Sequence, residues 1–156
     1  MANENDSTII ARMMQIPQHL MAEYFKQNSD RIQDDSTYWN VLGSLWKLGG
    51  TVIQQDLWKE LFQSHRKRCH KIMKSRERKR WRKLPKNILA YRAVNDESEA
   101  ETAISWTLSK SVAQQFSENG RRKVVTRIVN KDEVFAFFDR RHEEEIIVNI
   151  KQVKRR

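Results

Sequence analysis

The spacing of apolar residues changes at Pro85, and this change most constrains how the 156-residue chain folds. Before Pro85, apolar residues recur every three or four positions, which is the period of an amphipathic helix. After Pro85 they come in short runs rich in β-branched and aromatic residues, which are typical of strands. A helical half followed by a β half, without regular alternation of the two, predicts an α+β fold.

The first part of the chain is predicted to contain several helices. Apolar residues over 7–25 indicate two helical segments separated at Pro17, because proline is tolerated at a break or in a first turn. A shorter helix is expected over 38–48. A long helix is expected over about 51–83, where the apolar stripe continues until Pro85 stops it.

The positive charge of the chain is concentrated in one segment. The chain carries 30 Lys and Arg against 20 Asp and Glu, yet residues 64–86 alone hold 12 basic and 1 acidic side chain. A nucleic-acid coat protein would be basic throughout, so this distribution indicates a near-neutral protein with one basic helix. Crowded cations destabilise a helix unless something binds them, so we expect a nucleic acid or an acidic protein surface as partner. The cations predicted to contact it are Arg66, Lys67, Arg68, Lys71, Lys74, Arg78, Lys79 and Arg82.

The part of the chain after Pro85 is predicted to be mostly β. We therefore divide the chain into a helical region, 1–86, and a β core, 87–156, packed as one compact unit. A short helix is expected over 109–117, with Ser109 as its cap. The predicted strands are 88–94, 103–107, 123–129, 134–138 and 145–150.

Cysteine content and terminal composition bear on the cellular compartment. Cys69 is the only cysteine, so no intramolecular disulfide forms and no oxidising compartment is needed. The N-terminal residues are polar and acidic, unlike a signal peptide, and no apolar run approaches the roughly 18 residues of a membrane span. These features predict a cytoplasmic protein without membrane contact. His65, Cys69 and His70 lack the further ligands of a closed zinc site, so no metal is expected.

Three features of the β half form a candidate site. Arg92 follows an aromatic residue in the first strand, Ser105 begins a Ser-Trp-Thr sequence in the second, and glutamates 143–145 open the last. Alternation along a strand places Glu143 and Glu145 on one face. Two carboxylates on one face can divide the chemical work: one stabilises a developing cation while the other orients or deprotonates a nucleophile.

This order of motifs resembles the Arg–Ser–Glu class of ADP-ribosyltransferases. The segments YRA…ISWTLSKSVAQQF…VFAFFDRRHEEEIIV are similar to small bacterial and bacteriophage proteins of that class, over about residues 88–150. The resemblance implies a compact, mostly antiparallel β core with one short helix. It also implies NAD-dependent mono-ADP-ribosyltransferase activity, with NAD as co-substrate and a host protein as target, an arginine acceptor being favoured. A phage-encoded protein would act in the host cytoplasm.

The resemblance also implies a role for each catalytic residue. Glu145 would hydrogen-bond the nicotinamide ribose and stabilise the oxocarbenium-like charge as nicotinamide leaves. Ser105 would brace that glutamate, and Glu143 would orient or activate the acceptor. The three adjacent glutamates leave open whether Glu144 occupies the site instead.

The same resemblance implies which residues contact NAD. Arg92 would hold its phosphates or a ribose, because a guanidinium suits bidentate contacts. The other residues implied to contact NAD are Tyr91, Ser105 and Thr107, of which Thr107 would also support its strand. Trp106 would stack on an aromatic ring.

Each of these residues also has an ordinary structural interpretation. Arg92 would then form a surface ion pair, Ser105 and Thr107 would be common strand residues, and the glutamates would protect an edge strand from aggregation. The alternative function is a non-catalytic, phage-type inhibitor or binding protein. It would use the basic helix to engage nucleic acid or a nucleic-acid-binding host complex. The oligomeric state stays open.

Overall fold

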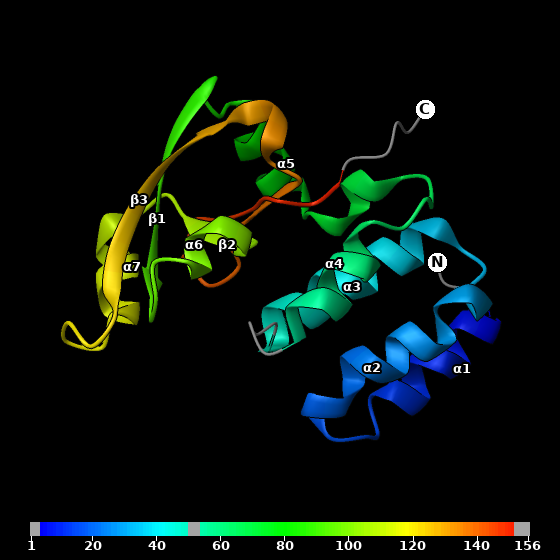
Figure 1. Ribbon diagram of the computed structural model, residues 1–156. Helices are drawn as coiled ribbons and strands as arrows, with labels where there is room; N and C mark the ends of the chain where they lie inside the picture. The colour runs from blue at the N-terminus through cyan, green and yellow to red at the C-terminus, as the bar shows by residue number, and fades with distance from the viewer. Residues whose placement is uncertain (1–3, 50–53, 152–156) are drawn as a thin grey trace. The chain divides into compact units, whose positions relative to one another are not determined.

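The computed structural model describes residues 4–49 and 54–151, which form two compact units (Figure 1). The first unit ends at Ile72, and the second extends from Met73 to Lys151. The chain therefore divides after Ile72 and not at 86/87. The difference arises because the basic helix following Met73 packs against the sheet and belongs to its unit.

The first unit is helical, as the apolar spacing predicts. Pro17 lies directly before the second helix, so the predicted break at this proline is confirmed. The helices are α1 (Glu4–Met13), α2 (Gln18–Asn28), α3 (Asp35–Gly49) and α4 (Gln55–Phe62), with short 3₁₀ segments η1 (Ser29–Arg31) and η3 (Cys69–Ile72).

Aromatic side chains from three of these helices form the core of the first unit. Trp46 of α3 lies edge-on to Trp58 of α4, with ring centroids 5.1 Å apart, and Phe62 packs against both. Phe25 of α2 packs against Tyr38 of α3 at 5.3 Å. Such pairs add to the area that each ring buries, so α2, α3 and α4 form one packed layer.

The prediction of one long helix over about 51–83 is wrong. Its first residues, 51–53, lie outside the described residues, and the rest is divided into α4, η3 and α5 (Ser75–Arg82). Between α4 and η3 the chain is held by partners distant in sequence. The Arg66 guanidinium donates to the Ser29 carbonyl at 2.7 Å and pairs with Asp35 at 3.1 Å, while Arg68 adopts a positive φ of 65°.

Asp34 caps α3 from the position directly before the first helical residue, Asp35. The Asp34 carboxylate accepts hydrogen bonds from the backbone N–H of Thr37 at 2.9 Å and from its hydroxyl at 2.6 Å. The Thr37 hydroxyl bond is the main cause that holds the pKa of Asp34 below its ordinary value.

We expect Asp34→Ala to lower the free energy of unfolding by about 1 kcal/mol at neutral pH, because the first turn of α3 loses its cap. A carboxyl whose pKa is lowered by folding stabilises the protein above its unfolded pKa. That contribution is lost as the pH falls through the folded value. Urea denaturation should therefore separate wild type and variant at neutral pH and bring them together in strong acid. A difference that persists in acid would contradict this role.

The second unit contains one five-stranded antiparallel sheet, so the predicted α+β class is confirmed. Ser109 caps α7 through a hydrogen bond from the N–H of Val112, as predicted. The elements after α5 are β1 (Asn87–Val94), α6 (Glu99–Thr102), β2 (Ser105–Thr107), α7 (Lys110–Phe116), β3 (Lys123–Asn130), η4 (Lys131–Glu133), β4 (Ala136–Phe138) and β5 (Glu145–Ile147).

The strand order is β3-β1-β2-β5-β4, so two pairs of consecutive strands, β1–β2 and β4–β5, lie side by side, while β3 pairs with neither β2 nor β4. Strands β1 and β3 pair along their whole length, from Asn87 opposite Asn130 to Val94 opposite Lys123. Figure 1 shows them as a long curved ribbon with α7 beside it. The shorter strands β2 and β5 occupy the middle of the sheet, which places the start of the glutamate-bearing strand next to the Ser-Trp-Thr strand.

Helix α5 covers the outer edge of β4. The backbone N–H of Asp139 donates to the Glu77 carboxylate at 2.8 Å, and the Trp81 indole donates to the Val134 carbonyl at 3.3 Å. An uncovered edge strand would expose unpaired N–H groups to other chains. The basic helix therefore completes the sheet instead of standing free in solvent. Within the described residues, no helix has the length and apolar character needed to cross a bilayer.

Candidate active site

The register of the sheet brings the predicted site residues onto adjacent strands. Thr107 of β2 lies opposite Tyr91 of β1 on one side and opposite Glu145 of β5 on the other. Directly opposed residues share a face, and so do residues two apart on one strand. Tyr91, Ser105, Thr107 and Glu145 therefore lie on the same face of the sheet.

A hydrogen bond joins the two central members of this group. The Ser105 hydroxyl donates to one carboxylate oxygen of Glu145, across 40 residues of sequence. Both side chains are part-buried, so the carboxylate is oriented by the sheet and still partly accessible. Ser105 thus braces Glu145 in the way that the resemblance implies.

The Arg92 side chain contacts the backbone of Ser105. Its guanidinium donates to the Ser105 carbonyl at 2.7 Å and to the Glu99 carboxylate at 3.1 and 2.9 Å. Strand alternation directs Arg92 to the face opposite Tyr91, and its side chain is only 12% exposed. The structure therefore links Arg92, Ser105 and Glu145, but Arg92 acts as a support for β2 and has little surface left for phosphates.

We expect Arg92→Lys to lower the free energy of unfolding by roughly 1–3 kcal/mol. A lysine ammonium cannot make the forked contacts by which the guanidinium reaches Ser105 and Glu99 together. Urea denaturation measures the change, and Arg121→Lys, at an exposed position of the same unit, is the control. Equal stability of the two variants would contradict the supporting role of Arg92.

The three glutamates have different surroundings. Glu144 adopts a positive φ of 45° and β5 begins only at Glu145, so the strand alternation on which the predicted shared face of Glu143 and Glu145 depends does not extend back to Glu143. The Glu144 carboxylate pairs with Arg80 at 3.0 Å, and the Glu143 carbonyl accepts a bond from the Thr107 hydroxyl at 2.6 Å. Glu145 is thus the glutamate that Ser105 holds, whereas Glu144 pairs with Arg80.

Two further residues predicted near NAD have structural roles. Trp106 is 2% exposed and donates through its indole N–H to the Ala103 carbonyl at 3.2 Å. This burial contradicts the stacking role predicted for Trp106. Thr107 is also buried and its hydroxyl ties β2 to the glutamate segment, which agrees with the predicted support of the strand.

The eight cations predicted to form one binding surface do not belong to one element. Arg66, Lys67, Arg68 and Lys71 belong to the first unit, and the remaining four to the second. Arg66 is engaged by Asp35 and lies over the Tyr38 ring at 4.9 Å, so it serves the packing of its own unit. In the second unit, Arg78 donates to the Met73 carbonyl at 2.7 Å. The eight cations therefore do not lie on the one helix that the sequence predicts.

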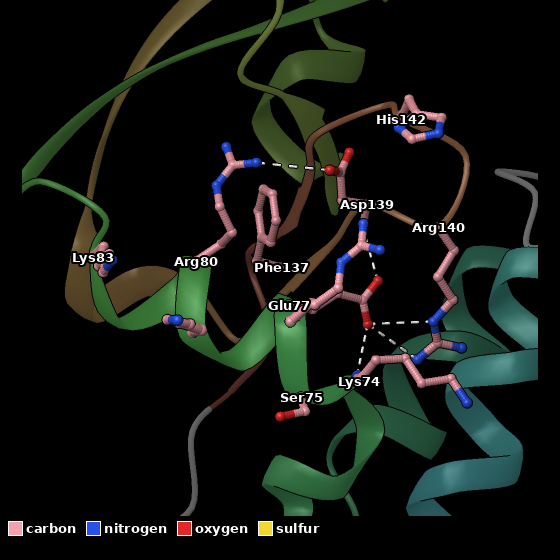
Figure 2. Close-up of a pocket in the computed structure, with 11 residues that line it drawn as sticks. Lys74, Ser75, Glu77, Arg80, Lys83, Phe137, Asp139, Arg140 and His142 are labelled. Carbon is pink, nitrogen blue, oxygen red and sulfur yellow. Dashed lines mark hydrogen bonds and ion pairs between the residues drawn. The ribbon is translucent and has the colours of Figure 1, made fainter.

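A pocket of about 730 Å³ lies beside α5 in the second unit (Figure 2). It includes two of the predicted cations, Lys74 and Lys79. Neither Ser105 nor Glu145 lines it, so the pocket is distinct from their hydrogen-bonded pair. The other four cations of the pocket were not predicted from the sequence. The strongly basic composition of 76–83 indicates three of them, but no local feature links Arg140 to that helix. The four missed cations are Arg76, Arg80, Lys83 and Arg140.

Comparison with known proteins finds no match: no family model, no curated protein and no solved structure is significantly similar to this chain.

Proposed function

We propose that this chain is an NAD-dependent mono-ADP-ribosyltransferase with Glu145 as its central catalytic residue. The observation that carries the proposal is the hydrogen bond by which Ser105 of β2 holds the Glu145 carboxylate of β5, with Tyr91 on the same face of the sheet. The sequence motifs alone do not require Ser105 and Glu145 to meet. Their meeting on adjacent strands supports the resemblance on which the proposal rests, while Arg92 supports β2 from the opposite face.

Glu145 would act on the bond between nicotinamide and its ribose. As the C1′–N bond breaks, the electron pair goes to the nicotinamide nitrogen, and positive charge develops on the ribose. A carboxylate fixed beside that sugar stabilises the charge in the transition state. The Ser105 hydroxyl holds Glu145 in position, so little reorganisation is needed during the reaction.

Tyr91 and the β1–β3 ribbon would receive the rest of the dinucleotide. Tyr91 shares a face with Glu145 and is half-buried. The same face continues to Leu89 and Ile128, which are 50% and 70% exposed. Apolar surface next to a polar catalytic group is typical of sites that bind a nucleotide base.

Glu143 would act on the acceptor. In this proposal the acceptor nitrogen, an arginine side chain being favoured, forms the new bond to C1′. It loses a proton to the Glu143 carboxylate, which then releases the proton to solvent. Glu143 precedes the turn at Glu144 and lies two residues from Glu145, so both carboxylates belong to one short segment.

Incubation with NAD labelled in its adenylate moiety and a bacterial lysate tests the proposal. We expect label to enter a macromolecular fraction and to resist removal by denaturation, because ADP-ribose is attached covalently. Separate protease and nuclease treatment identifies the acceptor class. The absence of covalent label at any NAD concentration would overturn the transferase proposal and favour the non-catalytic binding protein.

A further inference from the structure

The pocket beside α5 is strongly cationic. Six of its lining residues are basic, and two, Glu77 and Asp139, are acidic. The cations come from both sides of the pocket: most project from α5 and its flanking residues, and Arg140 comes from the segment after β4. They are Lys74, Arg76, Lys79, Arg80, Lys83 and Arg140.

The two acidic groups are already used within the protein. Glu77 is 4% exposed and pairs with Arg140 at 3.2 Å, while Asp139 pairs with Arg80 at 3.6 Å. Figure 2 shows Arg140 reaching Glu77 and Arg80 reaching Asp139 from opposite sides of the pocket. These acids therefore neutralise only the two arginines.

Four cations of the pocket are left without a carboxylate. Among residues 4–49 and 54–151, no acidic side chain forms an ion pair with Lys74, Arg76, Lys79 or Lys83. Like charges on two turns of helix repel one another, and a concave surface focuses their field. The pocket thus attracts an anion with more than one negative charge.

Two arginines of the pocket are held in place by contacts within the protein. The Arg80 guanidinium lies over the buried Phe137 ring at 4.9 Å, and Arg140 lies over Phe138 at 5.5 Å. Glu77 fixes α5 to the edge of β4 at the same time. Because these groups are already ordered, binding an anion would cost little conformational entropy.

We propose that this pocket binds the phosphate groups of nucleotides, carried either by a nucleic-acid strand or by a free nucleotide. Its volume lies within the roughly 300–1,000 Å³ of small-ligand sites, and its free lysines and arginine match a chain of phosphate oxygens. The inference does not depend on transferase activity, because the binding needs neither NAD nor Glu145.

Fluorescence anisotropy of a short fluorescein-labelled oligothymidylate, with the full chain and no NAD, tests the proposal. Four phosphate contacts predict that affinity falls about 50-fold between 50 and 200 mM salt, because each contact releases a counterion. In Lys79→Ala/Lys83→Ala the same change of salt should lower affinity only about 7-fold. Both lysines are exposed, and the circular dichroism spectrum should match that of the wild type.

The matched control is Lys110→Ala/Arg121→Ala, which removes two exposed cations of the same unit outside the pocket. Its salt dependence should equal that of the wild type. Competition by ATP at concentrations similar to the unlabelled oligonucleotide would assign the site to free nucleotides, whereas competition by the oligonucleotide alone would assign it to a strand. A flat salt response, or equal losses in the two double variants, would overturn the proposal.

Discussion

Replacing Glu145 by glutamine is expected to slow ADP-ribose transfer by about 10²–10³-fold or more while leaving the fold unchanged. Glutamine has nearly the same shape as glutamate, and its amide oxygen can still accept the hydrogen bond from Ser105. What it lacks is the negative charge that would stabilise the ribose cation. Initial rates of label transfer from NAD, compared at equal protein concentration, measure the effect.

Glu144→Gln is the matched control, because it removes the neighbouring charge in the same segment. The Glu144 carboxylate is 37% exposed and pairs with Arg80, away from Ser105. An exposed ion pair contributes no more than about 1 kcal/mol, so this variant should keep its fold and nearly its full rate. If Glu144→Gln lost the activity and Glu145→Gln retained it, the assignment of the catalytic carboxylate would be wrong.

The β half of the fold could be predicted from sequence because its signals are local. Every predicted strand corresponds to an observed one, and the boundaries differ by up to three residues. Apolar runs bounded by polar turns are enough to locate β1 and β3, and the hydroxyl of Ser109 marks the start of α7. The strand order, with β2 between β1 and β5, depends on contacts across the sheet and is not encoded in any one segment.

The helical half shows what local signals cannot supply. Residues 63–68 are all polar or charged, and only His65 falls on the helical spacing that continues from α4. They form a loop whose polar groups bond to α3 and to the turn before it. The Trp39 indole donates to the Lys67 carbonyl at 2.9 Å, and Arg66 binds the Ser29 carbonyl. These tertiary bonds compensate for the helical bonds that the loop gives up.

The N-terminal segment is a second region where local sequence signals are not sufficient. The N-terminal residues are polar and acidic, yet Asp6 is fully buried. Its carboxylate accepts from the backbone N–H groups of Gln33 at 2.8 Å and Asp34 at 2.9 Å. An acidic residue is usually exposed, so its burial can be recognised only once these distant donors are known.

The candidate site could be predicted from the sequence only in part. Motif order placed Ser105 and Glu145 on strands that the sequence also predicts and that lie side by side, whereas Arg92 supports β2 from the opposite face. The position of Glu143 could not be predicted, because a left-handed backbone at Glu144 is unusual for glutamate and has no sequence signal. The pocket cation Arg140 was missed for a related reason: its partner Glu77 lies 63 residues away.

Removing the Glu77 carboxylate should cause a large loss of stability. In Glu77→Ala we expect the free energy of unfolding of the second unit to fall by about 3–5 kcal/mol, the cost of breaking a buried ion pair by deleting one partner. The carboxylate accepts from the backbone N–H groups of Lys74 at 2.7 Å and Asp139 at 2.8 Å, besides pairing with Arg140. All three donors would be left without their acceptor.

Amide hydrogen exchange gives a local readout of the same change. The Asp139 N–H should exchange much faster in Glu77→Ala, because α5 no longer covers the edge of β4. Glu97→Ala is the control, since it removes an exposed glutamate that pairs with exposed Lys123 and should change stability by less than about 1 kcal/mol. If both variants lost equal stability in urea, α5 would not be anchored through Glu77. The ordering of Arg80 and Arg140 in the pocket beside α5 would then have no structural basis, because both are held in place by the same contact between α5 and β4.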